Sequence, residues 1–247
     1  MSDKESGILE VSIVLPAYNE AETLKNAVEK VISSIERVTS SYEIIIAEDG
    51  STDGTDKIAY ALSRKYPFII HLHEDERLGR GEALKNAFVK SRGRILIYLD
   101  VDLATDPRYI PTLVNLIRDG YDLATGSRML KGSRSKRKFS RKIASKCYNF
   151  LVRTILRSKL RDHQCGFKAF KREPLLKVLN EIKSKGWFWD TEAIIIFSRK
   201  GYRIKEFPVE WKEGESTKVD ILKDSVSMSI QIFKLWWRLK TQHRSRT

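Results

Sequence analysis

The sequence has few cysteines and no long apolar run, and each absence excludes a class of protein. Cys147 and Cys165 are the only cysteines among 247 residues. Two thiols without a metal-binding spacing argue against a disulfide scaffold and against a zinc site, and we expect both to be reduced in an intracellular protein. No apolar run reaches about 18 residues, so no transmembrane helix is expected. The first six residues are polar, unlike a signal peptide.

The charge is strongly one-sided and limits the class of partner. The chain has 46 Lys and Arg against 32 Asp and Glu, a net charge of +14. This excess attracts phosphate-bearing partners, whether nucleic acid, anionic lipid or nucleotide sugar. The basic residues are scattered, and there is no helix-turn-helix, zinc-finger or RNA-recognition signature, so we expect no nucleic-acid partner.

The first half of the chain alternates between the apolar periods of strands and helices. Strands are expected at 11–15, 43–47, 68–72, 94–99 and 122–126, and helices at 22–35, 53–65, 82–91 and 106–118. This alternation predicts an α/β fold with a mostly parallel central sheet and right-handed crossovers. Residues 131–138 interrupt the pattern with a charged loop that we expect to be mobile.

Two more helices are expected in the second half. One has an apolar face between Ile143 and Ile155, and the other covers 221–239. The later helix has an apolar stripe formed by Leu222, Val226, Ile230, Phe233 and Trp237, which Ile232, Leu235 and Trp236 broaden. Trp beside Lys and Arg favours a membrane surface, while packing on the sheet or on a second subunit explains the stripe equally well. We expect a catalytic domain at 8–220 and an amphipathic helix with a basic tail at 221–247.

Three of the expected strands end in polar clusters. These are Asp100-Val101-Asp102, the acidic run 48–53, and the segment from Pro16 to Glu20. The carboxyl ends of parallel strands meet in one ligand crevice. Two carboxylates separated by one residue suit a divalent cation that bridges the protein to a diphosphate, because hard cations take oxygen ligands.

Together these segments resemble the inverting family 2 glycosyltransferases, which have the Rossmann-like GT-A fold, and most of all the dolichyl-phosphate sugar synthases. The resemblance covers residues 11–220. Its matching segments are Leu15-Pro16-Ala17-Tyr18-Asn19-Glu20, Glu48-Asp49-Gly50-Ser51-Thr52-Asp53, Gly79-Arg80-Gly81, Asp100-Val101-Asp102, Gly126-Ser127-Arg128, and Asp162-His163-Gln164-Cys165-Gly166-Phe167-Lys168.

The resemblance implies a site for a nucleotide sugar, with Asp49 accepting a hydrogen bond from the base. The residues implied to bind the nucleotide sugar are Pro16, Tyr18, Glu20, Asp49, Gly81, Asp100, Val101, Lys212 and Lys218. Read alone, the first of these segments is an ordinary strand-to-helix turn, and Asp53 is expected to cap the next helix.

The resemblance also implies Mg²⁺ or Mn²⁺ bound by Asp100 and Asp102, with Asp102 the more direct ligand. Mannosyl-transferring relatives often have Gln two residues later, where this chain has Ala104. The glucosyl-transferring branch is the better match at this position, and the segments 164–168 and 188–192 agree with it.

Arg128, Arg141 and Ser145 are implied to bind the acceptor phosphate, because the planar fork of Arg can hold two phosphate oxygens. For Arg141 a solvated helix start is the alternative. Asp190 completes the implied catalytic set of Asp102, Arg128, Arg141 and Asp190. Asp190 is expected to deprotonate an acceptor, to orient a basic side chain or to bind sugar hydroxyls, and Glu192 is the other candidate base.

The sequence therefore predicts transfer of glucose from UDP-glucose to a polyprenyl (dolichyl) phosphate, with inversion, by a cytoplasmic protein held peripherally on the cytosolic face of a membrane. The alternatives are a synthase that uses GDP-mannose, and a family 2 transferase that acts on a glycan hydroxyl. A nucleotide-sensing relative without activity is disfavoured by the intact Asp100-Val101-Asp102. The oligomeric state stays open.

Overall fold

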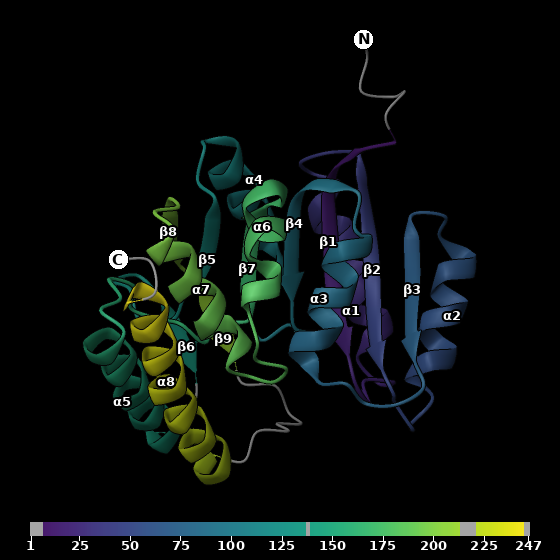
Figure 1. Cartoon of the computed structure of the whole chain (residues 1–247). Coiled ribbons are helices and arrows are strands. Elements are labelled where there is room, and N and C mark those ends of the chain that lie inside the picture. The colour runs from purple at the N-terminus through teal and green to yellow at the C-terminus, as the bar shows by residue number, and fades with distance from the viewer. Residues whose placement is uncertain (1–6, 137–138, 213–220, 245–247) are drawn as a thin grey trace.

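The computed structural model describes residues 7–136, 139–212 and 221–244. A seven-stranded sheet forms its centre, with helices on both faces (Figure 1). The strand order is β3-β2-β1-β4-β7-β5-β8, and every neighbouring pair is parallel except those made by β7. The predicted fold class, a mostly parallel α/β sheet flanked by helices, is confirmed.

The strands of the large sheet are β1 (Leu9–Ala17), β2 (Tyr42–Asp49), β3 (Ile69–Glu74), β4 (Gly93–Leu99), β5 (Leu123–Ser127), β7 (Phe167–Lys171) and β8 (Ile204–Pro208). β1 and β2 are buried along almost their whole length, which explains their near-continuous apolar sequences. All five strands expected from the apolar runs are present.

The helices are α1 (Leu24–Ile35), α2 (Thr55–Lys65), α3 (Arg80–Lys90), α4 (Ile110–Arg118), α5 (Phe139–Ile155), α6 (Arg172–Val178), α7 (Trp189–Arg199) and α8 (Ile221–Arg244), with short 3-10 turns η2 (Pro107–Tyr109) and η3 (Leu179–Glu181). Helices α1, α2 and α4 share one apolar cluster with the sheet, and α3, α6 and α7 share another. The two clusters lie on opposite faces because successive strand residues point in opposite directions.

The charged segment 131–138 is only partly a loop. Residues Arg134–Lys136 form strand β6, which pairs in parallel with β9 (Glu210–Lys212). The expectation of a loop is therefore wrong for these three residues, because a partner 76 residues later in the sequence supplies the hydrogen bonds. Thr105 also bridges to Trp211, so this small sheet lies beside the segment that follows β4.

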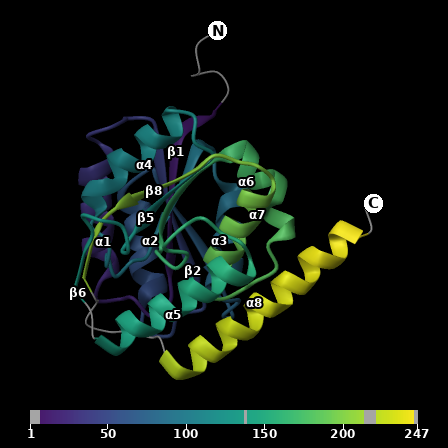
Figure 2. The ribbon, with the colours of Figure 1, turned by 90° about the vertical axis from the view of Figure 1, so that its left-hand side faces the viewer.

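Helix α8 packs beside α5 at one end of the molecule (Figure 2). Ile232 and Leu235 of α8 are buried against Val152 of α5 and against Phe188. By contrast, Phe233 and Trp237 are more than half exposed. Packing on the protein therefore explains one face of this helix. The other face keeps apolar side chains on the surface, and its contact with a membrane stays a prediction.

Candidate active site

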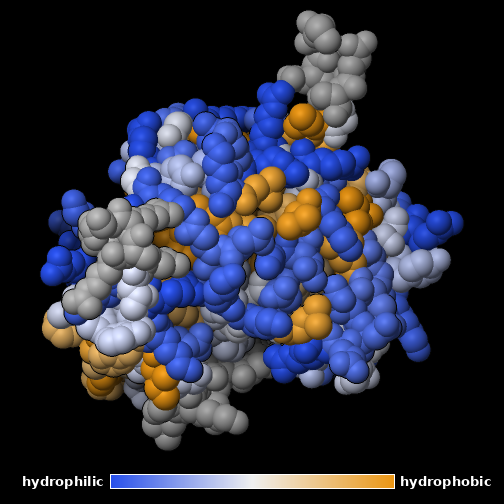
Figure 3. Space-filling model, in the orientation of Figure 1, coloured by the Kyte–Doolittle hydropathy of each residue, from blue (hydrophilic) through white to orange (hydrophobic). Residues whose placement is uncertain are grey.

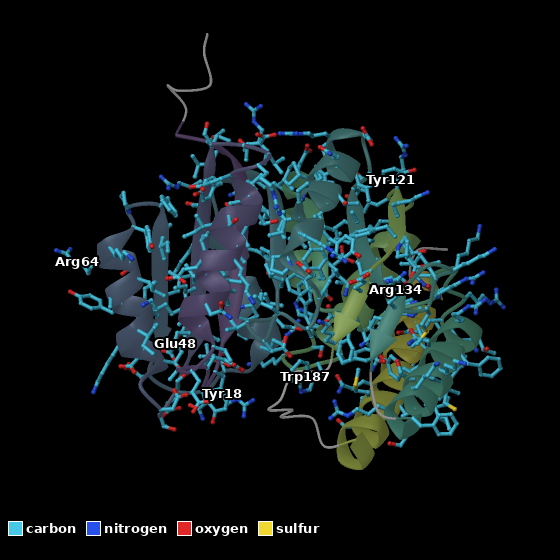
Figure 4. The ribbon with its side chains drawn as sticks, turned by 180° about the vertical axis from the view of Figure 1, so that it is seen from behind. Tyr18, Glu48, Arg64, Tyr121, Arg134 and Trp187 are labelled. Carbon is cyan, nitrogen blue, oxygen red and sulfur yellow. The ribbon has the colours of Figure 1, made fainter. Side chains whose placement is uncertain are left out.

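The candidate site lies at the carboxyl edge of the sheet, where β1, β2 and β4 end. β7 runs antiparallel to β4 and therefore starts at this edge, with Phe167 paired to Leu99. Figure 4 shows Tyr18, Glu48 and Trp187 along the lower edge of the molecule, at these strand ends. The sequence expectation that the three polar clusters meet at one edge agrees with this arrangement.

Asp100 and Asp102 follow β4 but have different surroundings. Oδ1 of Asp100 accepts hydrogen bonds from Nε and Nη2 of Arg80, at 2.9 and 2.7 Å. The Asp102 side chain is exposed, and its Oδ1 accepts the backbone N–H of Ala104 at 3.0 Å. Partial desolvation and the neighbouring charge of Asp100 raise the pKa of Asp102 to about 6.

This pair of carboxylates fits a divalent cation. Arg80 already balances the charge of Asp100, whereas Asp102 forms no ion pair with any residue that the structure describes. Arg80 holds Asp100 in place, whereas the Asp102 side chain stays exposed; that Asp102 is the more direct metal ligand stays a prediction. Mg²⁺ and Mn²⁺ both favour oxygen ligands of this kind.

Asp190 is enclosed by three donors. Arg80 Nη1 donates to its Oδ2 at 2.9 Å, Lys168 Nζ donates to its Oδ1 at 2.8 Å, and the Tyr98 hydroxyl also donates to Oδ1. Asp190 is 3 % exposed and Lys168 is fully buried. Burial raises the pKa of Asp190 to about 6 against the opposing effect of Arg80, and burial lowers the pKa of Lys168 to about 7. Asp190 thus contacts two basic side chains, as the second of its three expected roles requires.

Arg80 links the two carboxylates and was assigned no role from sequence. Its guanidinium bridges Asp100 and Asp190 and lies 5.3 Å from the ring centroid of Trp187. Lys168 was also missed, because it belongs to a buried strand where Lys is rare. Two signals in the sequence could have found them: Arg80 lies between two glycines at a helix start, and Lys168 lies within a strand.

Gly166, just before β7, packs closely against Asp100. A Cβ atom at this position would lie 1.9 Å from Oδ2 of Asp100, closer than any real contact allows. The backbone N–H of Asp100 also donates to the Gly166 carbonyl at 3.3 Å, so the two backbones lie close together and a side chain at position 166 would clash with Asp100.

Asp49 and Gly81 are engaged with the protein itself. The two Asp49 oxygens accept the backbone N–H groups of Leu78 and Gly79, at 2.7 and 3.0 Å. A Cβ on Gly81 would lie 2.6 Å from the Ser184 carbonyl oxygen. Asp49 thus holds the loop before α3, and the close approach at Gly81 is to residue 184. That the two residues also bind the nucleotide sugar stays a prediction.

The segment after β1 is tied to the segment after β2. The backbone N–H of Asn19 donates to the Ser51 hydroxyl at 3.0 Å, and that of Glu20 donates to the Thr55 hydroxyl at 2.8 Å. Tyr18 stacks on Arg77, with 3.8 Å from the guanidinium carbon to the ring centroid. Pro16 pairs with Ala47 inside the sheet, one strand position before the edge. The N-cap of α2 is Gly54 rather than Asp53 as expected, and Asp53, one residue earlier, accepts the Thr55 N–H at 3.0 Å.

Two of the three expected acceptor residues contact the segment 162–164. Nε and Nη2 of Arg128 bind Asp162 at 2.7 and 2.8 Å, and Ser145 donates to the Gln164 side chain at 3.2 Å. Although burial acts against it, Asp162 raises the pKa of Arg128. Arg141 lies one turn before Ser145 on α5 and is partly exposed.

The remaining expected residues are less central. The backbone N–H of the exposed Lys212 donates to the Ala104 carbonyl at 2.8 Å. Ala104 is two residues after Asp102. Val101 is buried. Lys218 lies outside the described residues. Glu192 is buried and accepts the N–H groups of Lys183 and Ser184, at 3.0 and 2.8 Å, so its carboxylate shapes this loop.

The buried Arg128–Asp162 pair leads to a stability prediction. Asp162→Ala leaves a buried guanidinium without its carboxylate, and we expect the free energy of unfolding to fall by about 3–5 kcal/mol. Chemical denaturation measures it. Glu173→Ala, which breaks the exposed pair between Glu173 and Lys177, is the control and should cost less than about 1 kcal/mol. Equal losses in the two variants would contradict a structural role for the buried pair.

Comparison with protein families identifies the chain. The model of "Glycosyl transferase family 2" matches residues 12–179, which contain both clusters of aspartates and the Gly79–Gly81 turn. The chain belongs to glycosyl transferase family 2. The sequence-based family assignment is confirmed.

Several curated relatives agree with this assignment. The chain is 46% identical to "Glycosyltransferase AglD" of Haloferax volcanii over 96% of its length, and it spans 38% of that relative. It is 28% identical to the "Dolichyl-phosphate beta-glucosyltransferase" of Drosophila melanogaster and to that of Saccharomyces cerevisiae. Those alignments cover 95% and 89% of this chain, and 77% and 72% of the two relatives.

Solved structures show the same fold. Glucosyl-3-phosphoglycerate synthase from Mycobacterium tuberculosis, in complex with Mn²⁺, UDP and phosphoglyceric acid, matches with a TM-score of 0.68 and 20% identity. The match covers 92% of this chain and 77% of that chain. A complex of the same enzyme with Mn²⁺, UDP-glucose and phosphoglyceric acid matches with a TM-score of 0.67 and 22% identity.

Proposed function

We propose that this chain transfers glucose from UDP-glucose to a polyprenyl phosphate of the dolichyl type, with inversion at the anomeric carbon. The observation that carries the proposal is the enclosure of Asp190 by Arg80, Lys168 and Tyr98. A hydroxyl acceptor needs a base, whereas a phosphate acceptor is already ionised near neutral pH. The names of the dolichyl-phosphate relatives support the same acceptor.

The reaction is a direct displacement. An acceptor phosphate oxygen forms the new bond to the anomeric carbon as the bond to the nucleoside diphosphate breaks on the opposite face, so the configuration inverts. Arg128, Arg141 and Ser145 bind the acceptor phosphate, and the donor lies along the strand ends near Tyr18 and Asp49. Alignment of the two partners supplies much of the rate enhancement.

We also propose that the enzyme depends on Mg²⁺ or Mn²⁺. Asp102 would bind the ion directly and Asp100 would support it, held by Arg80. When bound, the ion stabilises the negative charge that develops on the leaving diphosphate. The Mn²⁺ in the solved structures of the mycobacterial synthase supports this assignment.

Comparing donors tests the proposed sugar. Purified protein is incubated with short-chain polyprenyl phosphate and either radiolabelled UDP-glucose or GDP-mannose, with Mg²⁺ or Mn²⁺. The proposal predicts a labelled lipid from UDP-glucose. A labelled lipid from GDP-mannose alone would keep the acceptor and replace the sugar, despite Ala104.

A lipid acceptor requires contact with a membrane surface. Within the described residues, no helix is long and apolar enough to cross a bilayer. Helices α5 and α8 instead expose large apolar side chains at one end of the molecule (Figure 3). These are Phe139, Ile143 and Phe150 on α5, and Ile230, Phe233 and Trp237 on α8. Exposed Lys142, Lys146, Lys234 and Lys240 on the same helices suit anionic headgroups.

We propose that this surface attaches the protein to the cytosolic face of a membrane. In this proposal the catalytic domain covers 8–220, and α8 with the tail, 221–247, is its membrane-contact extension.

The membrane surface leads to a binding prediction. The double variant Phe233→Ser/Trp237→Ser removes two aromatic groups that would enter the interface, and we expect binding to anionic vesicles to weaken at least about tenfold. Co-sedimentation measures it. Tyr60→Ser is the matched control: Tyr60 is 60% exposed on α2, at the other end of the sheet (Figure 1). Unchanged binding of the double variant would show that α8 is not the anchor.

A further inference from the structure

A second group of ligand atoms lies at the edge of the sheet, on β2 and β3. Glu48 of β2 is paired in register with His73 of β3, and His71 lies two residues earlier on the same face of β3. One ligand atom from each of these three side chains lies within 4.8 Å of the other two. The DxD pair, Asp100 and Asp102, contributes no atom to this group.

Two of the three side chains contact each other directly, and each has a second contact that orients it. Nδ1 of His73 lies 2.5 Å from Oε2 of Glu48, and Nε2 on the far side of the ring lies 3.5 Å from Oδ1 of Asp75. The other Glu48 oxygen accepts the Ser51 N–H at 2.5 Å. Metal-bound His and carboxylate groups are oriented by second contacts of this kind.

His71 distinguishes this group from a simple ion pair. Nε2 of His71 is buried and has no hydrogen-bond partner among the described residues. An ion pair between His73 and Glu48 alone does not explain this atom. A ring nitrogen of His71 lies close to the Glu48 carboxylate and to the His73 ring, where a cation could bind all three side chains. A buried polar atom without a partner is costly, and a bound cation would satisfy it.

We propose that Glu48, His71 and His73 bind a zinc-class divalent cation at a site separate from the DxD pair. Two imidazoles and one carboxylate suit Zn²⁺ or a similar first-row ion, whereas Mg²⁺ prefers oxygen ligands alone. The cysteine count argued against zinc, but this ligand set uses no cysteine.

The position of the ion gives it a role in the donor site. Glu48 holds the Ser51 N–H, and the Ser51 hydroxyl accepts the N–H of Asn19, beside Tyr18. A cation on Glu48 would therefore fix the contact between the segment that follows β1 and the segment that follows β2. This role rests on the proposed function, but binding of the ion does not.

Cobalt provides a direct test. The full chain, purified without a histidine tag, is titrated with Co²⁺, and the ligand-field absorption is recorded before and after Zn²⁺ or excess Mg²⁺ is added. We expect one bound Co²⁺ that Zn²⁺ displaces and Mg²⁺ does not. His73→Gln should weaken Co²⁺ binding by more than about 100-fold, and Asp75→Asn should weaken it by about 10–100-fold.

Two controls keep this test independent of catalysis and of folding. Asp102→Asn should bind Co²⁺ as the wild type does, even when sugar transfer is lost. Zn²⁺ should raise the melting temperature of the wild type but not that of His73→Gln, whose substituted side chain is exposed. Co²⁺ absorption that is absent in the wild type, or equal in His73→Gln, would overturn the proposal.

Discussion

Asp102→Asn is expected to lower the rate of sugar transfer by about 10³-fold while leaving the fold intact. The substitution removes the charge of the carboxylate proposed to bind the metal directly, and a metal bound to a leaving group contributes several kcal/mol of charge stabilisation in the transition state. Each 1.36 kcal/mol corresponds to a factor of about ten in rate. The side chain is exposed, so the melting temperature should hardly change.

The control for this variant is Asp106→Asn. Asp106 lies four residues later and accepts the Arg108 N–H at 2.9 Å, a contact that Asn can keep. Transfer of radiolabelled glucose should be nearly unaffected. If Asp102→Asn retained more than about a tenth of wild-type activity at saturating Mn²⁺, Asp102 would not be the direct metal ligand.

The second large effect is expected at Asp190, where two different substitutions separate structure from catalysis. Asp190→Ala leaves Arg80 and Lys168 without their shared carboxylate, and we expect a loss of about 3–5 kcal/mol in unfolding free energy. That loss is a large part of a typical stability of about 5–15 kcal/mol. Asp190→Asn keeps an acceptor for both cations and should cost less.

Activity measurements on Asp190→Asn then report on the role of Asp190. Loss of a general base typically costs about 10²–10⁴-fold in rate. Because we propose an acceptor that is already ionised, we expect Asp190→Asn to lose about tenfold or less, measured where the variant is folded. Glu181→Ala, which breaks the exposed pair between Glu181 and Lys200, controls for the loss of an ion pair. A drop of 10³-fold in Asp190→Asn would make Asp190 a base.

The strands of the first half were predictable because their sequence carries the signal. β1, β2 and β4 are buried on both faces, so their apolar runs mark them directly. β7 was missed because its sequence, Phe-Lys-Ala-Phe-Lys, is neither a continuous apolar run nor a strict alternation. The burial of its Lys168 depends on the Cys165 carbonyl and on Asp190, which lies 22 residues away. Long-range pairing of this kind leaves no local pattern.

The site was predictable as a list of residues, but not as a network. The resemblance supplied Asp100, Asp102 and Asp190, yet the Arg80 bridge between two of them depends on how α3 and α7 pack at the sheet edge. The position of Glu192 in its loop depends on the same packing. On α8, apolar side chains occur on several faces, so the pattern alone did not show that Ile232 and Leu235 face the protein.

The choice of acceptor is the central claim, and one competition experiment tests it most directly. The enzyme is given radiolabelled UDP-glucose with equal amounts of a short polyprenyl phosphate and a polyprenyl-linked sugar that offers only hydroxyl acceptors. We predict that the label enters the polyprenyl phosphate, giving a glucosyl phosphate lipid that mild acid cleaves. Label found mainly on the sugar hydroxyl, in an acid-stable glycoside, would contradict the account and require a base that Asp190 does not provide.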